Sequence, residues 1–296
     1  MRIGLVGLCQ VHAVGDGFRH LLEDAQIISI EASAFKRAGK IAQAEALIAN
    51  CDIVFCHQLP SEFESLATAE LRKRFPRLIM IPVIAFTGFH PDSMYFFLGQ
   101  KQFESPVGKF HSAIVAAAYS LNLSADRADS LFNSFIFRQL GYFDEFAKAR
   151  QFLKATMQAA DLDIEQEWES WMAPGAFMHT INHPKAYVLA SIAKMLAANQ
   201  GLIAPNQPTP DLQHDHLSNV TIWPVYPELA RPNGITGNYQ FKRAGNLDLL
   251  QGNSMLLKRR EFIAKCYDLY PGFPPEIFDL PRVSATREII KSMIRL

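Results

Sequence analysis

Short apolar runs alternate with helical patterns along the first hundred residues. We expect buried strands over residues 2–6, 27–30, 52–55 and 78–84. Amphipathic helices are expected between them, over residues 11–23, 36–49 and 61–74. Strands that alternate with helices are typical of parallel βαβ units. The pattern therefore predicts an α/β fold, with a small parallel sheet and flanking helices in the N-terminal part.

Helix boundaries are indicated by a few local signals. Ser61 and Glu64 fit a capping box at the start of the third helix. His183 precedes Pro184, and Gly201 follows the same apolar pattern, which predicts a helix from His183 to about Gln200. In this interpretation His183 occupies the N-cap.

The pattern becomes mostly helical from about residue 110. Helices are expected over residues 114–121, 125–140 and 143–159, and later over residues 255–267 and the last dozen residues. Phe132, Phe135 and Phe146 lie at helical spacing and are interpreted as core residues. We therefore divide the chain into an α/β part, residues 1–109, and a mainly helical part, residues 110–296, packed together as one continuous unit.

Composition is that of an ordinary globular protein. Hydrophobic residues make up 49% of the chain and charged residues 20%, and 29 basic residues balance 29 acidic ones. A formal charge of zero lacks the basic excess typical of nucleic-acid binding, so no nucleic-acid partner is expected. The start of the chain lacks the pattern of a signal peptide, and no apolar run is long enough to span a membrane. A cytoplasmic location is the resulting expectation.

The four cysteines do not have the spacing of a metal site. Cys9, Cys51, Cys56 and Cys266 are too sparse for a disulfide scaffold and are interpreted as reduced thiols. His214 and His216 lie close to acidic residues, but they follow a proline-rich loop and do not complete a four-ligand pattern. We expect no metal.

Cys9 lies between the first strand and the first helix. A thiol near a helix N-terminus experiences the helix dipole, which favours the reactive thiolate. The alternative is that Cys9 is a small buried hydrophobic residue with no chemical function. His57 and His90 follow later strands of the same predicted sheet. Because right-handed crossovers bring the carboxyl ends of parallel strands to one edge, a crevice shared by Cys9, His57 and His90 is expected.

Several side chains near these strand ends have types suited to acyl transfer. His90 or His183 could act as a general base for Cys9, and Asp92 could orient a histidine. Gln10 and Gln58 could donate hydrogen bonds to an oxyanion, although solvated loop glutamines fit the pattern equally well. The N-terminal glycines fit neither a dinucleotide fingerprint nor a phosphate-binding loop. Nicotinamide chemistry and nucleotide hydrolysis are therefore not expected.

Three segments together resemble the WcbI-like polysaccharide biosynthesis family. They are Gly-Leu-Cys-Gln at residues 7–10, Phe-Thr-Gly-Phe-His-Pro-Asp at residues 86–92, and Phe-Met-His-Thr-Ile-Asn-His-Pro-Lys at residues 177–185. The resemblance extends from the first strand to about Leu196 and becomes faint after Asn206. The family's first motif usually reads Gly-Asn-Cys-Gln, and this chain has Leu8 where the family has asparagine.

The resemblance implies a function in making bacterial capsular polysaccharide. The family is thought to contain acetyltransferases that bind coenzyme A and modify a sugar hydroxyl. Cys9, Gln10, His90, Asp92 and His183 match its motifs. The resemblance thus implies an O-acetyltransferase that uses acetyl-coenzyme A as acyl donor and a sugar or polysaccharide precursor as acceptor.

Two other functions stay open at this point. A thiol-dependent esterase or deacylase could use the same residues, because water can resolve an acyl-enzyme as readily as a sugar can. A noncatalytic carbohydrate- or cofactor-binding protein is the other alternative, since Leu8 replaces an asparagine that could hold an oxyanion or a substrate.

Overall fold

The computed structural model describes residues 1–245 and 255–294. The chain divides into two compact units, between which its segments alternate. Unit 1 comprises Met1–Ala85, Phe152–Phe177 and His183–Leu217, and unit 2 comprises Phe86–Gln151, Met178–Asn182 and Ser218–Leu296. The boundary expected after residue 109 therefore lies inside unit 2, because the chain first leaves unit 1 after Ala85.

Unit 1 contains a four-stranded sheet in the order β2-β1-β3-β4. All three pairings are parallel, as the sequence predicts. The strands are β1 (Arg2–Gly7), β2 (Gln26–Glu31), β3 (Ile53–Cys56) and β4 (Leu78–Met80). The chain builds the sheet outward in one direction from β1 and in the other from β3. The strand order therefore reverses between β1 and β3, which makes this pair the topological switch point.

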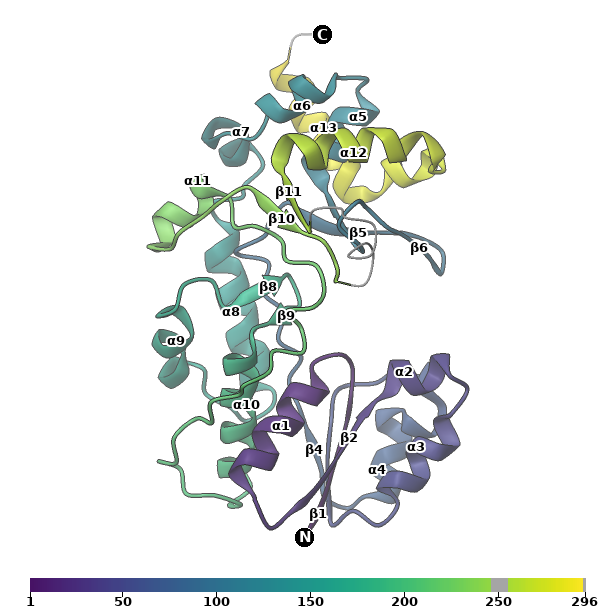
Figure 1. Ribbon diagram of the computed structural model, residues 1–296, viewed down its shortest axis with the longest axis vertical. Coiled ribbons are helices and arrows are strands. Elements are labelled where there is room, and N and C mark those ends of the chain that lie inside the picture. Colours follow the sequence, from purple (N-terminus) through teal and green to yellow (C-terminus); the bar gives the residue numbers. More distant parts are fainter. Residues whose placement is uncertain (246–254, 295–296) are drawn as a thin grey trace. The chain divides into compact units, whose positions relative to one another are not determined.

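Helices cover both faces of this sheet (Figure 1). On one face lies α1 (Val11–Leu21), whose Phe18 ring lies 4.8 Å from that of Phe55 in β3. The other face packs Val54 against apolar side chains of the remaining helices. Those helices are α2 (Ala32–Arg37), α3 (Ile41–Ile48), the 3-10 helix η1 (Ser61–Leu66) and α4 (Thr68–Arg74). Successive residues of β3 thus fill two separate apolar layers, as a doubly wound sheet requires.

Two helices expected to be continuous are interrupted. The helix expected over residues 36–49 is split into α2 and α3, and Gly39 between them has a φ of +65°. The helix expected over residues 61–74 is split into η1 and α4, and Glu64 has a φ of +53°. No side-chain cap forms at the start of η1, so the predicted Ser61–Glu64 capping box is wrong. The fourth strand is also shorter than expected.

Two further helices complete unit 1, together with part of a third. They are α9 (Glu165–Met172), α10 (Ala186–Asn199) and the end of α8 (Glu145–Gln158). Helix α10 packs closely on α1, since a Cβ on Gly17 would lie only 2.6 Å from the Cβ of Ala193. His183–Pro184 form the short strand β9, and Lys185 is the N-cap of α10. The prediction that His183 caps this helix is therefore wrong.

Unit 2 contains an antiparallel sheet that the sequence analysis did not predict. Its order is β6-β5-β7, with β5 (Ser93–Leu98), β6 (Lys101–Phe103) and β7 (Phe110–Ser112). The strands of this sheet have only three to six residues and carry little periodic signal, so the sheet was not predicted from longer patterns. His111 of β7 stacks on Phe96 of β5 with ring centroids 3.8 Å apart. The sheet therefore forms part of an aromatic core.

Helices make up most of the rest of unit 2. They are α5 (Ala113–Ser120), α6 (Ala125–Ser130), α7 (Ser134–Gln139), the start of α8, α11 (Pro227–Ala230), α12 (Arg259–Leu269) and α13 (Pro281–Met293). Short strands and 3-10 helices connect them, namely β8 (Met178–Thr180), β10 (Gln240–Lys242), β11 (Leu256–Lys258), η2 (Arg231–Asn233), η4 (Tyr270–Gly272) and η5 (Pro275–Asp279). The mainly helical C-terminal part is thereby confirmed.

Some details of this helical part differ from expectation. The helix expected over residues 125–140 is two helices, α6 and α7. The helix expected over residues 255–267 begins only at Arg259, after β11, and the last two residues of the expected terminal helix lie outside the described residues. Phe132 is buried as predicted, whereas Phe135 is 60% exposed, so its assignment to the core was wrong.

Candidate active site

Two polar segments of unit 1 meet at the carboxyl ends of β1 and β3. Cys9, which is half-buried, lies in the turn that follows β1, and His57 follows β3 directly. The two strands pair in register up to Val6 and Cys56. Ligands of open α/β sheets bind outside the carboxyl ends of the strands at a topological switch point. The expected neighbourhood of the Cys9 and His57 segments is therefore confirmed within unit 1.

His57 lies directly against the end of β1. Its Nδ1 accepts a hydrogen bond from the Leu8 amide at 2.9 Å. A Cβ on Gly7 would lie 2.3 Å from the same nitrogen, so only glycine leaves room for the imidazole here. His57 has no exposed surface, and its burial lowers its pKa to about 4. The imidazole is consequently neutral at pH 7.

Gln10 is buried and its side chain bonds to the segment that follows β4. Its Nε2 donates to the carbonyl of Ile84 at 2.8 Å, and its Oε1 accepts from the Ile84 amide at 3.0 Å. Both ends of the amide are thus used to hold two loops together at the same edge of the sheet. These two bonds give Gln10 a positioning function, and the oxyanion contact expected from the sequence stays a prediction. Gln58, by contrast, is exposed.

The N-terminus of α1 lies immediately after Cys9. Gln10 occupies the N-cap position but makes no side-chain hydrogen bond to the helix, and the first turn contains no acidic residue. The first amides of a helix point outward and carry a partial positive charge. Such an end favours a thiolate, an oxyanion or a phosphate group beside it.

A second group of ionisable side chains lies along α1. His12 Nε2 is 3.7 Å from the Glu31 carboxylate at the end of β2. His216 Nε2 is 2.6 Å from the carboxylate of Asp16 in α1. This contact holds the loop that contains His216 against α1. Burial is the main cause of the lowered pKa of His12, and the charge of Glu31 opposes it. From the sequence, His216 was considered only as a metal ligand, and the position of Glu31 at the end of β2 was the signal that was missed for His12.

His183 lies in unit 1, just before α10. It is half-buried. The N-terminal amide of α10 at Ala186 is bonded instead by the Asp215 carboxylate, at 3.2 Å. Burial lowers the pKa of the adjacent Lys185, and the charge of Asp215 partly offsets that effect. His183 is therefore not used as a helix cap, which leaves its expected chemical function as a proposal.

Asp92 lies in unit 2 and is completely buried within a set of hydrogen-bond donors. Ser112 Oγ at 2.5 Å and Tyr226 Oη at 2.7 Å bond to one oxygen. The Ile114 amide at 2.9 Å and Tyr142 Oη at 3.1 Å bond to the other. Burial first, and then the negative charge of Asp92, raise the pKa of both tyrosines. Four donors match the acceptor capacity of a carboxylate, and none that the structure describes is a histidine.

His90 is buried two residues before Asp92. Its amide donates to the Thr87 carbonyl at 2.9 Å, and its carbonyl accepts from the Ser93 amide at 3.0 Å. His90 therefore lies in the turn that the sequence predicted, and that turn leads into β5 of unit 2. The direct orientation of a histidine by Asp92, expected from the sequence, has no counterpart among the described contacts of Asp92.

Comparison with known proteins assigns the chain to a family. The family model described as "Polysaccharide biosynthesis enzyme WcbI" matches residues 2–205, which is more than half of the chain. The chain belongs to the WcbI polysaccharide biosynthesis enzyme family. The resemblance inferred from the three sequence segments is thereby confirmed. No curated protein matches the chain significantly.

A solved structure has the same fold as this WcbI family member. It is described as WcbI, a polysaccharide biosynthesis enzyme, in its native form without a disulfide bond between coenzyme A and one of its cysteines. The two chains are 16% identical, with a TM-score of 0.74, and the match covers 98% of this chain and 97% of the other. At this identity the likeness establishes a common fold over nearly the whole length.

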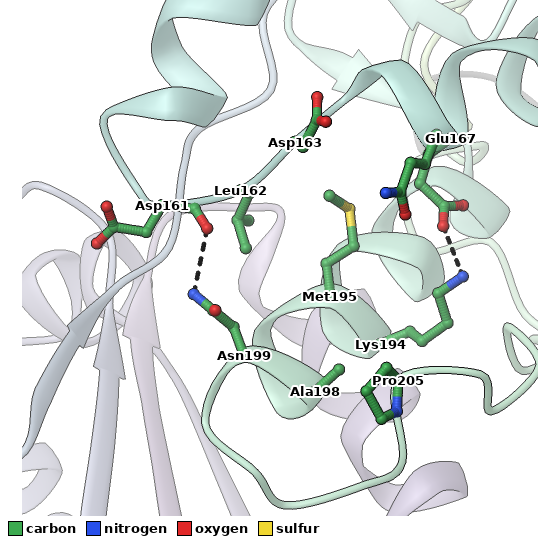
Figure 2. Close-up of a pocket in the computed structure, with 10 residues that line it drawn as sticks. Asp161, Leu162, Asp163, Glu167, Lys194, Met195, Ala198, Asn199 and Pro205 are labelled. Carbon is green, nitrogen blue, oxygen red and sulfur yellow. Dashed lines mark hydrogen bonds and ion pairs between the residues drawn. The ribbon is translucent and has the colours of Figure 1, made fainter.

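A pocket of about 310 Å³ lies elsewhere in unit 1 of this WcbI family member, beside α9 and α10 (Figure 2). Glu167 bonds to Lys194 across it at 2.6 Å, and Asn199 donates to the carbonyl of Asp161 at 3.2 Å. None of the five residues predicted for the active site lines this pocket. Glu167 and Lys194 thus satisfy each other's charge, which favours a structural interpretation of this pocket.

The described residues contain neither a metal-binding cluster nor a membrane-spanning helix. In residues 1–245 and 255–294, no group of three or more histidine, cysteine or acidic side chains is arranged to hold a metal ion. Within the same residues, no helix is long and apolar enough to cross a membrane.

Proposed function

We propose that this protein is a coenzyme A-dependent O-acetyltransferase that modifies a sugar of a bacterial surface polysaccharide precursor. One observation carries the proposal: in a chain of the WcbI family, Cys9 follows β1 at the switch point of the sheet and directly precedes the N-cap residue of α1, which makes no side-chain cap. A thiol in that position has the surroundings that stabilise a thiolate.

The surroundings of Cys9 also fit a coenzyme A thioester. The amides at the start of α1 can receive a phosphate or a developing oxyanion, because neither a capping side chain nor an acidic residue competes for them. The related WcbI structure is itself described in terms of coenzyme A and a cysteine. Together these features support coenzyme A as the ligand of this edge of the sheet.

The proposed reaction uses Cys9 as the acceptor of the acetyl group. Acetyl-coenzyme A would supply the acetyl group as a thioester. The Cys9 thiolate attacks the thioester carbonyl, the bond from that carbonyl to the coenzyme A sulfur breaks, and the coenzyme A thiolate leaves. A sugar hydroxyl then attacks the acetyl-cysteine while a general base takes its proton, so that a sugar ester forms and the thiolate of Cys9 returns.

His183 and His90 are the candidates for the general base. In this scheme Asp92 acts indirectly, because its four hydrogen bonds hold the segment that carries His90 in place. Gln10 likewise acts indirectly, through its two bonds to Ile84. In a second version of the mechanism, Cys9 orients the coenzyme A thioester and the sugar attacks that thioester directly.

Replacing Cys9 with serine separates the two versions. We expect C9S to bind coenzyme A but to lose sugar-dependent release of coenzyme A from acetyl-coenzyme A. We also expect the peptide of the wild-type protein that contains Cys9 to gain about 42 Da, because an acetyl group replaces the thiol hydrogen. Cys51→Ser is the matched control, because Cys51 is also half-buried in unit 1. Near-normal turnover by C9S would overturn the covalent version. Hydrolysis of acetyl esters without coenzyme A would favour an esterase instead.

A further inference from the structure

His57 is a buried histidine that the proposed mechanism does not use, and it contacts the turn that carries Cys9. Its amide donates to the carbonyl of Val6 at 2.9 Å, which is the last regular contact of β3 with β1. Its imidazole Nδ1 then accepts from the Leu8 amide at 2.9 Å. The side chain thus extends the pairing of β1 and β3 beyond the end of the strands, as far as the residue before Cys9.

The hydrogen-bond directions determine the tautomer of His57. An imidazole nitrogen that accepts from an amide cannot itself carry a proton, and burial keeps the ring neutral. The single proton must therefore be on Nε2. With Nδ1 occupied and Nε2 protonated, His57 offers no basic lone pair to a substrate or to the Cys9 thiol. Its chemistry is that of a fixed acceptor for the backbone rather than that of a general base.

The backbone of His57 is also held by side chains of its own unit. Its carbonyl accepts from Cys56 Sγ at 2.8 Å and from Thr68 Oγ1 at 3.2 Å. Thr68 Oγ1 in turn accepts from the Leu59 amide at 2.8 Å. His57, which holds the turn with Cys9, is therefore itself fixed by Thr68 at the start of α4. Its backbone consequently has little freedom to move.

Gly7 makes this arrangement possible. Any larger residue would place a Cβ within 2.3 Å of Nδ1 and displace the ring. The chain thus pairs a residue without a side chain in β1 with a large planar side chain after β3. The fit indicates that the position of the Leu8 amide, and with it the direction of the Cys9 turn, is determined by this contact.

We propose that His57 is a positioning residue that fixes the Leu8 backbone and so holds the Cys9 thiol beside the first amides of α1. The inference rests on the proposed function in one respect, namely that Cys9 is the reactive thiol. Without the acceptor of His57, the Leu8 amide would be free to turn and the thiol would lose its fixed place near the helix dipole. The pKa of Cys9 would then rise.

The test compares two substitutions of His57. Asparagine places its Oδ1 near the position of Nδ1 and keeps an acceptor for the Leu8 amide, whereas leucine fills similar space without one. The rate of iodoacetamide alkylation of the Cys9 peptide is measured against pH by mass spectrometry, with Cys51 as internal reference. We expect His57→Leu to raise the midpoint of the Cys9 profile by about one pH unit, which is about tenfold in thiolate at low pH. We expect the Cys9 midpoint of His57→Asn to lie close to that of the wild-type protein.

His111→Leu is the matched control for a general loss of stability. His111 is equally buried, its pKa is also lowered to about 4, and its ring makes one hydrogen bond to a backbone carbonyl, but it lies in unit 2. The proposal requires His111→Leu to leave the Cys9 midpoint unchanged. An unchanged or lowered midpoint in His57→Leu, or an equal rise in the control, would overturn it.

The wild-type protein offers a test that needs no folded variant. Long-range proton–nitrogen NMR correlations distinguish the two neutral tautomers of histidine and the charged form. We expect His57 to be neutral at pH 7 with its proton on Nε2; a proton on Nδ1, or a charged ring, would contradict the proposal. Neither measurement requires coenzyme A. A failure of coenzyme A binding would therefore count against the proposed function alone.

Discussion

Gly7 and His57 show how two residues far apart in sequence determine one backbone position. The imidazole occupies the space that a side chain at Gly7 would need, and it supplies the acceptor for the next amide. A completely buried ring cannot move aside without a large cost in free energy, because protein interiors are close-packed. At this scale, the shape of the candidate active site depends on the absence of one Cβ.

Replacing Gly7 with alanine is expected to lower the free energy of unfolding by about 2 to 4 kcal/mol, because the new Cβ overlaps the imidazole. Urea denaturation measures the change. Gly4→Ala in the same strand is the control: its Cβ would lie 3.2 Å from Cys51 Sγ, a tight contact but no overlap. We expect a loss below about 1 kcal/mol there. Equal losses in the two variants would contradict the packing described for Gly7.

Gln10 offers a second residue-scale test, which separates holding a loop from contacting a substrate. Glutamate at this position would lose the amide donor and place a negative charge against the Ile84 carbonyl. We expect Gln10→Glu to lower the free energy of unfolding by about 3 kcal/mol, since a buried charge then lies against a carbonyl oxygen and keeps only the bond from the Ile84 amide. The exposed Gln58→Glu should change it by less than about 0.5 kcal/mol. A stable Gln10→Glu protein with lost activity would instead favour an oxyanion contact.

At the scale of helices and strands, the close contact of α1 with α10 brings the segment after His183 against the helix that follows Cys9. Both helices belong to unit 1, and Gly17 and Ala193 are the small residues at their contact. Small residues allow helix backbones to approach closely. The geometry of this pair therefore depends on side-chain volume at two positions.

A double-mutant cycle tests that dependence. We expect Gly17→Ala to destabilise the protein even though alanine favours helices, because the new Cβ would lie 2.6 Å from that of Ala193. Ala193→Gly in the same chain should recover the loss, with a coupling energy of about 1 kcal/mol or more. The free energies come from thermal or urea unfolding of the four proteins. Strictly additive effects would show that the two positions do not touch.

The sequence was most informative where a pattern ran over several residues. Apolar strands alternating with helices predicted the parallel sheet, and Cys9 and His57 were correctly placed at its carboxyl edge. Interruptions of helices that depend on the backbone angle of one residue were missed, as at Gly39 and Glu64, which have positive φ. The antiparallel sheet of unit 2 was missed as well, because its strands are short and two of them have three residues each.

The candidate site could be predicted only as a set of residue types. Sequence spacing does not reveal hydrogen bonds, so the bonds of Gln10 to Ile84 and of Asp92 to two tyrosines were unforeseen. Both side chains looked suited to catalysis because they follow strands. Both are buried, which only the folded chain determines, and their described bonds hold loops; their expected functions in catalysis stay predictions.

At the scale of the whole molecule, each unit contains one completely buried neutral histidine. His57 lies in unit 1 and His111 in unit 2, and burial is the main cause that lowers the pKa of each from 6.5 to about 4. The unfolded chain binds these protons below pH 6.5, whereas the folded chain binds them only below about pH 4. Folding is therefore opposed by acid over that window.

Stability is expected to rise with pH between about 4 and 6.5 and to lose this dependence above it. Between the two ends of this pH range, each histidine changes the free energy of unfolding by about 3 kcal/mol, since one unit of pKa shift corresponds to roughly 1.4 kcal/mol. Urea denaturation from pH 4.5 to 7.5 measures the slope. His111→Gln, which keeps a donor for the Phe103 carbonyl, should reduce the slope by about half. An unchanged slope in that variant would show that buried histidines do not cause the acid sensitivity.

The most direct test of the account is a calorimetric titration of the purified protein with coenzyme A and with acetyl-coenzyme A. The account predicts saturable binding of both with micromolar affinity, equivalent to about 8 kcal/mol. Binding of neither ligand would contradict it, since Cys9 at the edge of the β1–β3 pair would then require a different acyl donor.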